Sequence, residues 1–212
     1  MKILGLTGSI GMGKSEAARM LKAMGVPVFE ADKAVHLLLG EGGAGVAEVQ
    51  RLFPDCVVGG LVDRARLGAK IFSDVHMKRQ LEAILHPLVR LQEKKFLAAQ
   101  RRKGKRIVAV DIPLLFETGA GERCDAVMVV TAPPMLQRQR VLKRAGMTEE
   151  KFHAILAAQM PDIQKRAQAD FLIHTGLGKQ VAMWQIRRAL KTLLLESHVR
   201  PRNRPRYRNH RA

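Results

Sequence analysis

An apolar run followed by a glycine-rich loop at the N-terminus constrains the fold of this chain more than any other feature. Residues Lys2–Thr7 read KILGLT, which is typical of a short buried strand, and the next eight residues read GSIGMGKS, a GxxxxGKS pattern. A helical pattern then runs from Lys14 to Met24. Because strand, glycine loop and helix in this order form the context of a Walker A phosphate loop, the sequence predicts such a loop here.

The residue types of this loop suit an anion bound at a helix N-terminus. Glycine permits torsions and a close approach that a Cβ would block, so successive N–H groups can point into one concavity. We expect Lys14 to reach the β- and γ-phosphates of a nucleotide and the Ser15 hydroxyl to ligate Mg²⁺. The alternative is a glycine turn whose Lys and Ser only cap a helix. The residues expected to bind the nucleotide are Gly8, Ser9, Ile10, Gly11, Met12, Gly13, Lys14 and Ser15.

Four further apolar runs predict a parallel sheet. They are VPVF at 26–29, IVAVD at 107–111, DAVMVVT at 125–131 and DFLIH at 170–174. Helical patterns lie between these runs, and strands that alternate with helices are typical of an α/β fold with a parallel sheet. We therefore expect a three-layer α/β/α fold with a five-stranded parallel sheet.

Two aspartates follow predicted strands, at the edge of a parallel sheet where ligands collect. Asp32 comes just past the second strand and is expected to face the phosphate loop. Its alternative role is the N-cap of a helix over residues 33–39. Asp111 ends the third strand in the position of a Walker B acid, so we expect it near Mg²⁺.

Two mostly helical blocks interrupt the strand pattern. The first, about residues 33–103, carries no strand signal and is the candidate for an inserted substrate-binding subdomain; His86–Pro87 should kink or split a long helix within it. The second, residues 135–168, is predicted to be helical throughout. It carries Arg140 and Arg144, which are four apart and hence on one face of a helix. Like charges spaced in this way favour a phosphate clamp or lid, with a solvated basic face as the alternative.

The composition is that of a globular protein, with 47% hydrophobic residues. No apolar run approaches the length of a membrane span and no cleavable leader precedes the first strand, so we expect a cytoplasmic protein with no membrane partner. Cys56 and Cys124 lie far apart without metal-ligand spacing, which favours reduced thiols.

The net charge of +18 arises from both the body of the chain and its end. Residues 198–212 are rich in arginine, contain no acid and read as a basic, disordered tail. For this tail a solubilising role is favoured over nucleic-acid binding. The basic body suits small polyanionic substrates. With one Trp, one Tyr and no nucleic-acid-binding motif, the chain is not expected to have a specific nucleic-acid partner.

Taken in order, these segments resemble the dephospho-coenzyme A kinase family, whose members have the P-loop NTPase fold. The phosphate loop alone indicates only the superfamily, whereas the other segments in this order are specific to the family. The matching segments are GLTGSIGMGKS at 5–15, EAD at 30–32, LVDRARLGAKIF at 61–72, HP at 86–87, DIPLLFE at 111–117, QRQR at 137–140 and AQADFLIHTG at 167–176.

The resemblance implies a reaction and roles for the residues found above. ATP would phosphorylate the ribose 3′-hydroxyl of 3′-dephospho-CoA with the help of Mg²⁺, and Asp32 would accept or orient the proton of that hydroxyl. The implied catalytic residues are Asp32, Lys14 and Arg140, with Ser15 and Asp111 at the metal and Arg144 at the nucleotide. The implied acceptor-cleft residues are Asp32, Arg64, His86, Leu114 and Leu115.

The resemblance also implies a division of the chain. The nucleotide-binding core would comprise residues 1–32, 104–134 and 169–197, the acceptor-binding subdomain residues 33–103 and the helical lid residues 135–168. The tail at 198–212 lies outside the family pattern. We expect a monomer, with weak oligomerisation as the alternative.

Two residues depart from the family pattern, and two other functions stay open. Glu16 stands where a Thr is usual, and His174 stands where an Asn is common. One alternative function is a kinase of the same fold that acts on another small metabolite or nucleotide, which should lack the segments at 61–72 and 86–87. The other is a nucleotide-dependent nucleic-acid-binding protein that uses the basic tail.

Overall fold

The computed structural model describes residues 1–195, without the side chains of residues 72 and 73. The chain forms two compact units. Of the described residues, the first unit comprises Met1–Phe29 and those from Gln100 to Leu195, and the second comprises Glu30–Ala99. Asp32, which the predicted boundaries assign to the nucleotide-binding core, therefore belongs to the second unit. The arginine-rich tail expected at 198–212 lies outside the described residues.

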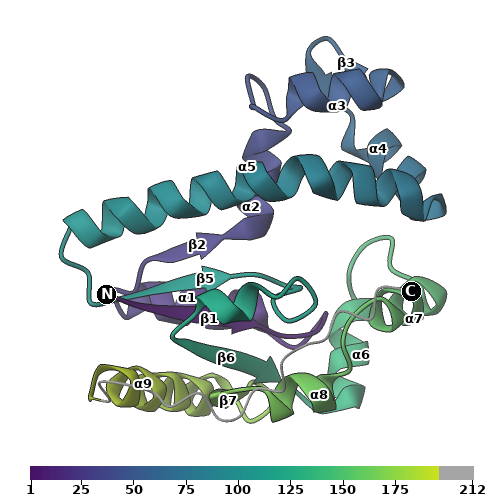
Figure 1. Cartoon of the computed structure of the whole chain (residues 1–212). Coiled ribbons are helices and arrows are strands. Elements are labelled where there is room, and N and C mark those ends of the chain that lie inside the picture. Colours follow the sequence, from purple (N-terminus) through teal and green to yellow (C-terminus); the bar gives the residue numbers. More distant parts are fainter. Residues whose placement is uncertain (196–212) are drawn as a thin grey trace. The chain divides into compact units, whose positions relative to one another are not determined.

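A five-stranded sheet forms the framework of the first unit, with the strand order β2-β5-β1-β6-β7 (Figure 1). The central strand β1 pairs in parallel with β5 and β6, and β6 pairs in parallel with β7. The predicted α/β fold with a five-stranded parallel sheet is thus confirmed. The strands are β1 (Lys2–Thr7), β2 (Val28–Glu30), β5 (Ile107–Asp111), β6 (Ala126–Thr131) and β7 (Phe171–His174).

Both faces of this sheet are buried, as its continuous apolar strands require. Successive side chains of a strand point to opposite faces. In β6 one set joins a core cluster with α1 (Lys14–Ala23) and α9 (Lys179–Leu195), whereas Val127 and Val129 join a second cluster with Leu115 and Met160. The β6 residues on the α1 and α9 side are Ala126, Met128 and Val130.

Three short helices follow β6, so the block at 135–168 is mostly helical, as predicted, but its two connections are not. Gly146 has a φ of 72° between the first two helices, and the Thr148 hydroxyl then caps the second by accepting a hydrogen bond from the Lys151 N–H. Pro161 is the N-cap of the third. The helices are α6 (Pro134–Leu142), α7 (Glu149–Ala157) and α8 (Asp162–Ala167), and a 3₁₀ turn at Ala120–Arg123 precedes β6.

The second unit is mainly helical and has its own apolar core. Val49 and Phe53 lie at the centre of this core, with Leu67, Leu81 and Leu85 around them. Its helices are α2 (Ala31–Leu38), α3 (Val46–Leu52), α4 (Arg64–Ser73) and α5 (Val75–Arg102), whose last turn reaches beyond the unit. A 3₁₀ turn at Pro54–Cys56 follows α3.

The absence of strands expected for this unit is wrong, and so is the split expected in its long helix. A small antiparallel hairpin joins β3 (Val57–Val58) to β4 (Leu61–Val62) where no strand was expected, and the intervening Gly59–Gly60 pair has φ values of 57° and 77°. Such a Gly-Gly pair between apolar residues favours a two-residue turn. In addition, α5 runs through Pro87, so the helix is not split at this position. Proline removes one helical N–H, but Leu81 and Leu85 anchor the preceding turns in the core.

No helix among the described residues has the length and apolar character needed to cross a membrane. Cys56 and Cys124 do not form a disulfide.

Candidate active site

The glycine loop between β1 and α1 has the conformation that its sequence predicts. Gly11 and Gly13 have φ values of 76° and 93°, which favour glycine. A Cβ at Gly11 would lie 2.5 Å from Val141 Cγ2, and one at Gly13 would lie 2.9 Å from Thr175 Oγ1. Both positions therefore require glycine for their torsion and for their close packing.

The first two N–H groups of α1 have no acceptor within the helix. Glu16 and Ala17 donate the first helical hydrogen bonds, both 3.1 Å long, to the carbonyl of Gly13. The N–H groups of Lys14 and Ser15 precede these bonds and therefore have no acceptor within the helix. Because the positive end of the helix dipole lies at the same place, this loop is suited to bind phosphate.

Lys14 is held by an acid at the end of the neighbouring strand. Its Nζ lies 2.5 Å from Asp111 Oδ1, and the two side chains are only 17% and 6% exposed. The pairing of Leu6 with Asp111 in adjacent parallel strands brings this carboxylate to the edge of the sheet where the loop begins. An ammonium held in this way stays beside the phosphate loop and can contact a bound phosphate.

The oxygen atoms of Ser15 and Asp111 fit the Mg²⁺ ion that the phosphate loop implies. The Ser15 side chain is exposed in the first turn of α1, and Asp111 ends β5. A hydroxyl and a carboxylate are hard oxygen donors, and Mg²⁺ is commonly held by one or two such groups together with substrate phosphates. Within residues 1–195, no group of three or more His, Cys, Asp or Glu side chains could hold a metal ion.

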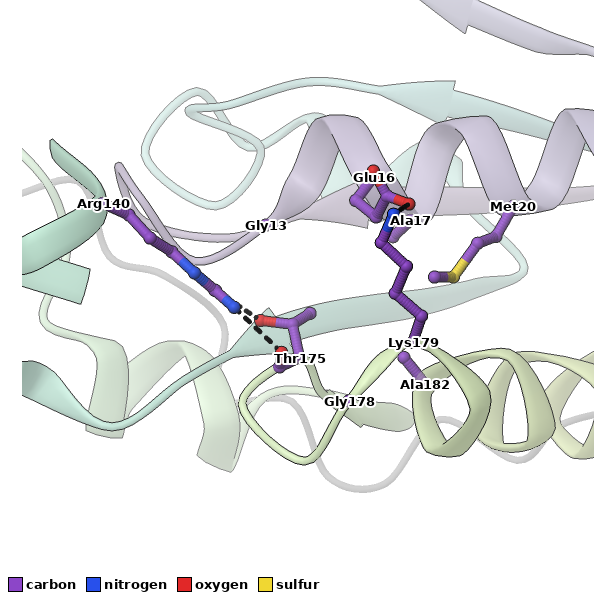
Figure 2. Close-up of a pocket in the computed structure, with 9 residues that line it drawn as sticks. All are labelled: Gly13, Glu16, Ala17, Met20, Arg140, Thr175, Gly178, Lys179 and Ala182. Atoms are coloured by element: carbon purple, nitrogen blue, oxygen red, sulfur yellow. Dashed lines mark hydrogen bonds and ion pairs between the residues drawn. The ribbon is translucent and has the colours of Figure 1, made fainter. Parts of the chain in front are cut away.

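Arg140 on α6 is seated on the phosphate loop through Thr175. Its two terminal nitrogens donate to Thr175 Oγ1 and to the Thr175 carbonyl, each at 3.0 Å (Figure 2). Thr175 Oγ1 in turn donates to the Met12 carbonyl at 2.6 Å. Arg140 NH1 also lies 3.5 Å from the Gly11 carbonyl. The guanidinium therefore sits beside the loop, with its orientation fixed by two hydrogen bonds.

Arg144 does not share a helix face with Arg140, so that expectation is wrong. Helix α6 ends at Leu142 because the chain turns toward Gly146, and Arg144 lies beyond the helix with its side chain exposed.

A cavity of about 240 Å³ opens beside the loop, between the first turns of α1 and the start of α9 (Figure 2). Ala17, Met20 and Ala182 give it an apolar lining. Its polar lining includes Glu16 and Lys179, whose Oε1 and Nζ atoms lie 3.5 Å apart. Since the cavity borders Gly13 and Arg140 as well, it could hold a flat apolar group attached to a phosphate chain.

Glu16, the first departure from the family pattern, is neutralised by two cations. Its second carboxylate oxygen pairs with Arg19 on the same helix, while Lys179 approaches from α9. The second departure, His174, ends β7 and donates its backbone N–H to Gln185 Oε1 at 2.8 Å.

The remaining first-unit candidates are two leucines that follow β5. Leu114 is half-buried, whereas Leu115 is fully buried in the core on the α8 side of the sheet. Leu115 therefore has no surface with which to contact a substrate in this conformation. Its expected place in an acceptor cleft is not supported, because it packs against Phe116 and the β6 valines.

The other candidates lie in the second unit. Asp32 is exposed in the first turn of α2; Glu30 is the N-cap of that helix, so the N-cap alternative for Asp32 is wrong. Arg64 opens α4 and contacts the ring of His36 through its guanidinium. His86 is exposed on α5, directly before Pro87.

Sequence reasoning missed several residues that contact the loop. Thr175 lies just past the carboxyl end of β7, where the rule for parallel sheets could have indicated it. Lys179 in the cavity wall gave no such signal. Gln137 and Gln159 also contact the loop; Gln137 lies in the family segment QRQR without a role assigned to it, and Gln159 is a polar residue in a helical block.

Comparisons with known proteins agree on one family. A family model described as dephospho-CoA kinase matches residues 2–178. A dephospho-CoA kinase of Mesorhizobium japonicum is 54% identical over 186 residues, covering 88% of this chain and 93% of the relative. A dephospho-CoA kinase of Paramagnetospirillum magneticum is 58% identical over 166 residues, covering 78% of each chain.

Two solved structures resemble the fold over most of their length. A Thermus thermophilus protein is 35% identical and superposes with a TM-score of 0.81, covering 92% of this chain and 98% of its own. A dephospho-CoA kinase from Campylobacter jejuni is 26% identical with a TM-score of 0.66, covering 90% of this chain and 96% of its own.

Proposed function

The chain belongs to the dephospho-CoA kinase family, and we propose that it transfers the γ-phosphoryl group of ATP to the ribose 3′-hydroxyl of 3′-dephospho-CoA. The products would be ADP and CoA, which makes this the final step of coenzyme A biosynthesis. The observation that carries the proposal is the phosphate loop itself, with Lys14 paired to Asp111 and Arg140 seated on the loop through Thr175.

Phosphoryl transfer depends on positioning and on stabilisation of the developing charge. The loop N–H groups and Lys14 would bind the β- and γ-phosphates. Arg140 would add a second fixed positive charge, because its hydrogen bonds to Thr175 hold the guanidinium beside the loop. Arg144, exposed past the end of α6, would contribute a weaker contact with the nucleotide.

The cavity beside the loop is the proposed site of the nucleotide base. It borders Gly13, so a triphosphate at the loop would bring the attached nucleoside to its opening. The apolar Ala17, Met20 and Ala182 would contact the face of an adenine ring. The polar lining residues Glu16 and Lys179 would contact the edge of the ring or the ribose.

Ser15 and Asp111 are the proposed protein ligands of Mg²⁺. When bound, the ion supplies positive charge that neutralises the phosphate oxygens. The exposed Ser15 hydroxyl would face the ion from α1 and Asp111 from β5. The pair with Lys14 keeps the Asp111 carboxylate oriented toward the loop.

Residues of the second unit are proposed for the acceptor. Asp32 would accept or orient the proton of the attacking 3′-hydroxyl, a role for which its exposed carboxylate is available. Arg64 and His86 would contact the phosphates or the adenine of dephospho-CoA, and both side chains are exposed. Leu114 is the remaining apolar candidate from the segment after β5.

The chain is further proposed to act in the cytoplasm as a monomer. We also propose that it has no specific nucleic-acid partner, because its sequence contains no nucleic-acid-binding motif. Removal of residues 198–212 should then leave turnover of dephospho-CoA intact, and loss of turnover would contradict an accessory role for that segment.

The proposed function is tested by a coupled assay of ADP release. ATP and Mg²⁺ are supplied with dephospho-CoA in one reaction and with AMP, shikimate or pantothenate in others. We expect turnover with dephospho-CoA far above that with the other acceptors. Turnover with another acceptor and none with dephospho-CoA would overturn the proposal and favour another kinase of the same fold.

A further inference from the structure

One residue of the phosphate loop, Ile10, is held by both of its backbone polar groups. The Ile10 N–H donates to Gln159 Oε1 at 3.1 Å, and the Ile10 carbonyl accepts from Gln137 Nε2 at 2.8 Å. Ile10 is thus the donor in one bond and the acceptor in the other. The Gln159 side chain must therefore present its amide oxygen to Ile10, and the Gln137 side chain must present its amide nitrogen. Most backbone groups bond to other backbone groups, whereas both polar groups of Ile10 bond to side chains.

The two glutamines come from different elements of the block after β6. Gln137 lies on α6 and is only 6% exposed, whereas Gln159 lies between α7 and α8 and is half-buried. Gln137 and Arg140 are three residues apart on α6, so they project from neighbouring positions of one helix. Helix α6 thus contacts the loop at Ile10 through one side chain and beside Gly11 through the other.

A buried ion pair fixes the backbone next to Gln159. Lys165 on α8 is 0% exposed, and its Nζ lies 2.9 Å from Glu117 Oε1, a close ion pair without the alignment of a hydrogen bond. The same Glu117 oxygen accepts a hydrogen bond from the Met160 N–H at 2.9 Å. Met160 directly follows Gln159 in the chain. A buried lysine requires a counter-charge, so Glu117 cannot easily leave this position.

These contacts form one path from a buried charge to the phosphate loop. Lys165 holds Glu117, Glu117 holds the backbone of Met160, and the adjacent Gln159 holds Ile10. Because the Ile10 N–H donates to Gln159, this group of the loop already has an acceptor. The N–H groups of Lys14 and Ser15 at the start of α1 stay available for phosphate.

We propose that Gln137 and Gln159 are positioning residues for phosphoryl transfer, which hold Ile10 and so preorganise the phosphate loop, and that the Glu117–Lys165 pair fixes Gln159. This inference rests on the proposed function, because preorganisation matters only if the loop binds a nucleotide. The gain is one of binding and orientation, since the loop does not have to be ordered when the phosphates arrive.

The direction of the two hydrogen bonds provides a sharp test. In Gln159→Glu, the carboxylate can still accept from the Ile10 N–H; in Gln137→Glu, an acceptor replaces the donor and faces the Ile10 carbonyl. Both variants add one negative charge near the loop, so each is a control for the charge of the other. We expect the ATP dissociation constant of Gln137→Glu to exceed that of Gln159→Glu by about 5- to 100-fold, the range for a lost hydrogen bond with an unsatisfied partner.

Binding of ATP is measured by titration calorimetry on the full chain without an acceptor, and thermal unfolding is followed for each variant. We expect Gln159→Glu to unfold near the wild-type temperature and Gln137→Glu at a lower temperature, because its nearly buried carboxylate faces the Ile10 carbonyl, so affinities are compared well below both transitions. Equal ATP affinities for the two variants, or wild-type affinity in Gln137→Glu, would overturn the proposal. A loss of ATP affinity only at temperatures at which the variant begins to unfold would also overturn it, because a purely structural role predicts that result.

The supporting ion pair is tested with Glu117→Leu, which also removes the acceptor of the Met160 N–H, and with the double variant Glu117→Leu/Lys165→Met. The single change leaves a buried lysine unpaired and should lower thermal stability, whereas the double change removes that charge and should restore it. We expect ATP affinity to stay reduced in the stable double variant if Glu117 acts on Gln159 through the Met160 backbone. Wild-type affinity in a stable double variant would remove the ion pair from the proposal.

The failure of this inference can be told apart from that of the proposed function. Absence of ADP release from the wild type with dephospho-CoA, together with normal ATP binding, would contradict the acceptor but leave the glutamine comparison valid. Normal turnover of dephospho-CoA by the wild type, with equal ATP binding by both glutamate variants, would contradict the positioning role alone.

Discussion

Lys14 Nζ lies 2.5 Å from Asp111 Oδ1, and this ion pair joins the phosphate loop to the carboxyl end of the neighbouring strand β5. The two residues are 97 positions apart in the sequence. Both carry proposed roles at the triphosphate, one for the phosphates and one for Mg²⁺. Because they have opposite charges, their substitution should affect nucleotide binding in opposite ways.

We predict that Lys14→Met lowers kcat/KM by about 10²- to 10³-fold, the usual cost of removing one donor to a developing charge. It should also weaken the binding of metal-free ATP, because a positive charge is lost from the loop. Asp111→Asn should instead raise the Mg²⁺ concentration that gives the half-maximal rate by about 10- to 100-fold, without weakening the binding of metal-free ATP. The check is a titration of Mg²⁺ at fixed ATP together with calorimetry in chelator. Wild-type Mg²⁺ dependence of Asp111→Asn would remove this residue from the metal site.

A second prediction concerns the proposed general base. Asp32→Asn should lower kcat by about 10²- to 10⁴-fold while leaving ATP affinity unchanged, because the amide cannot accept the proton of the 3′-hydroxyl. Steady-state rates with dephospho-CoA and separate ATP titrations measure the two effects. Asp55→Asn, which changes another exposed carboxylate of the same unit, is the matched control and should keep its rate. Near-normal turnover in Asp32→Asn would refute the assigned role.

The two arginines after β6 should differ strongly in their effect. Arg140→Ala should lower kcat by about 10²- to 10³-fold, because its guanidinium is held beside the loop by Thr175 and would stabilise the transferred group. Arg144→Ala should act mainly on KM, since its exposed side chain lies past the end of α6. Measurement of kcat and KM for both variants at saturating acceptor separates these outcomes. An unchanged kcat in Arg140→Ala would mean that this residue has only a structural role.

The sequence predicted the framework of the site well, because its signals there are local. The run IVAVD is buried at every position in β5, and the loop glycines have the torsions that the motif requires. Asp111 was found because it ends a strand, and parallel strands gather such ends at one edge of a sheet. These inferences need only a few adjacent residues and a rule about sheets.

The missed features depend on contacts between distant residues or on turn chemistry. Gln159 lies 149 positions from Ile10, and no spacing or period in the sequence relates a side-chain amide to a backbone group so far away. Arg144 was placed on the wrong face because the turn at Gly146 ends α6 early. Leu115 looked available beside Leu114, but which face of the chain is buried depends on the packing of β6 and Met160.

Glu16 and Lys179 provide the last prediction, because their contact explains how the loop tolerates an added anion. The carboxylate faces the cavity with Lys179 at 3.5 Å and Arg19 on its other oxygen. Lys179→Met should weaken ATP binding about 2- to 5-fold by leaving Glu16 less well compensated, and Glu16→Thr should strengthen it by a similar factor, as expected for a partly exposed pair. Both effects should shrink at high salt.

The double variant Glu16→Thr/Lys179→Met decides whether the two residues act through each other. If Lys179 serves to neutralise Glu16, its removal should cost little once Glu16 is gone, so the two changes should not be additive. Calorimetric ATP titrations of the wild type, both single variants and the double variant complete the cycle at one ionic strength. Strict additivity of the two changes in ATP binding free energy would mean that Lys179 acts on the nucleotide independently of Glu16. The ion pair of Glu16 with Arg19 would then be the contact to test next.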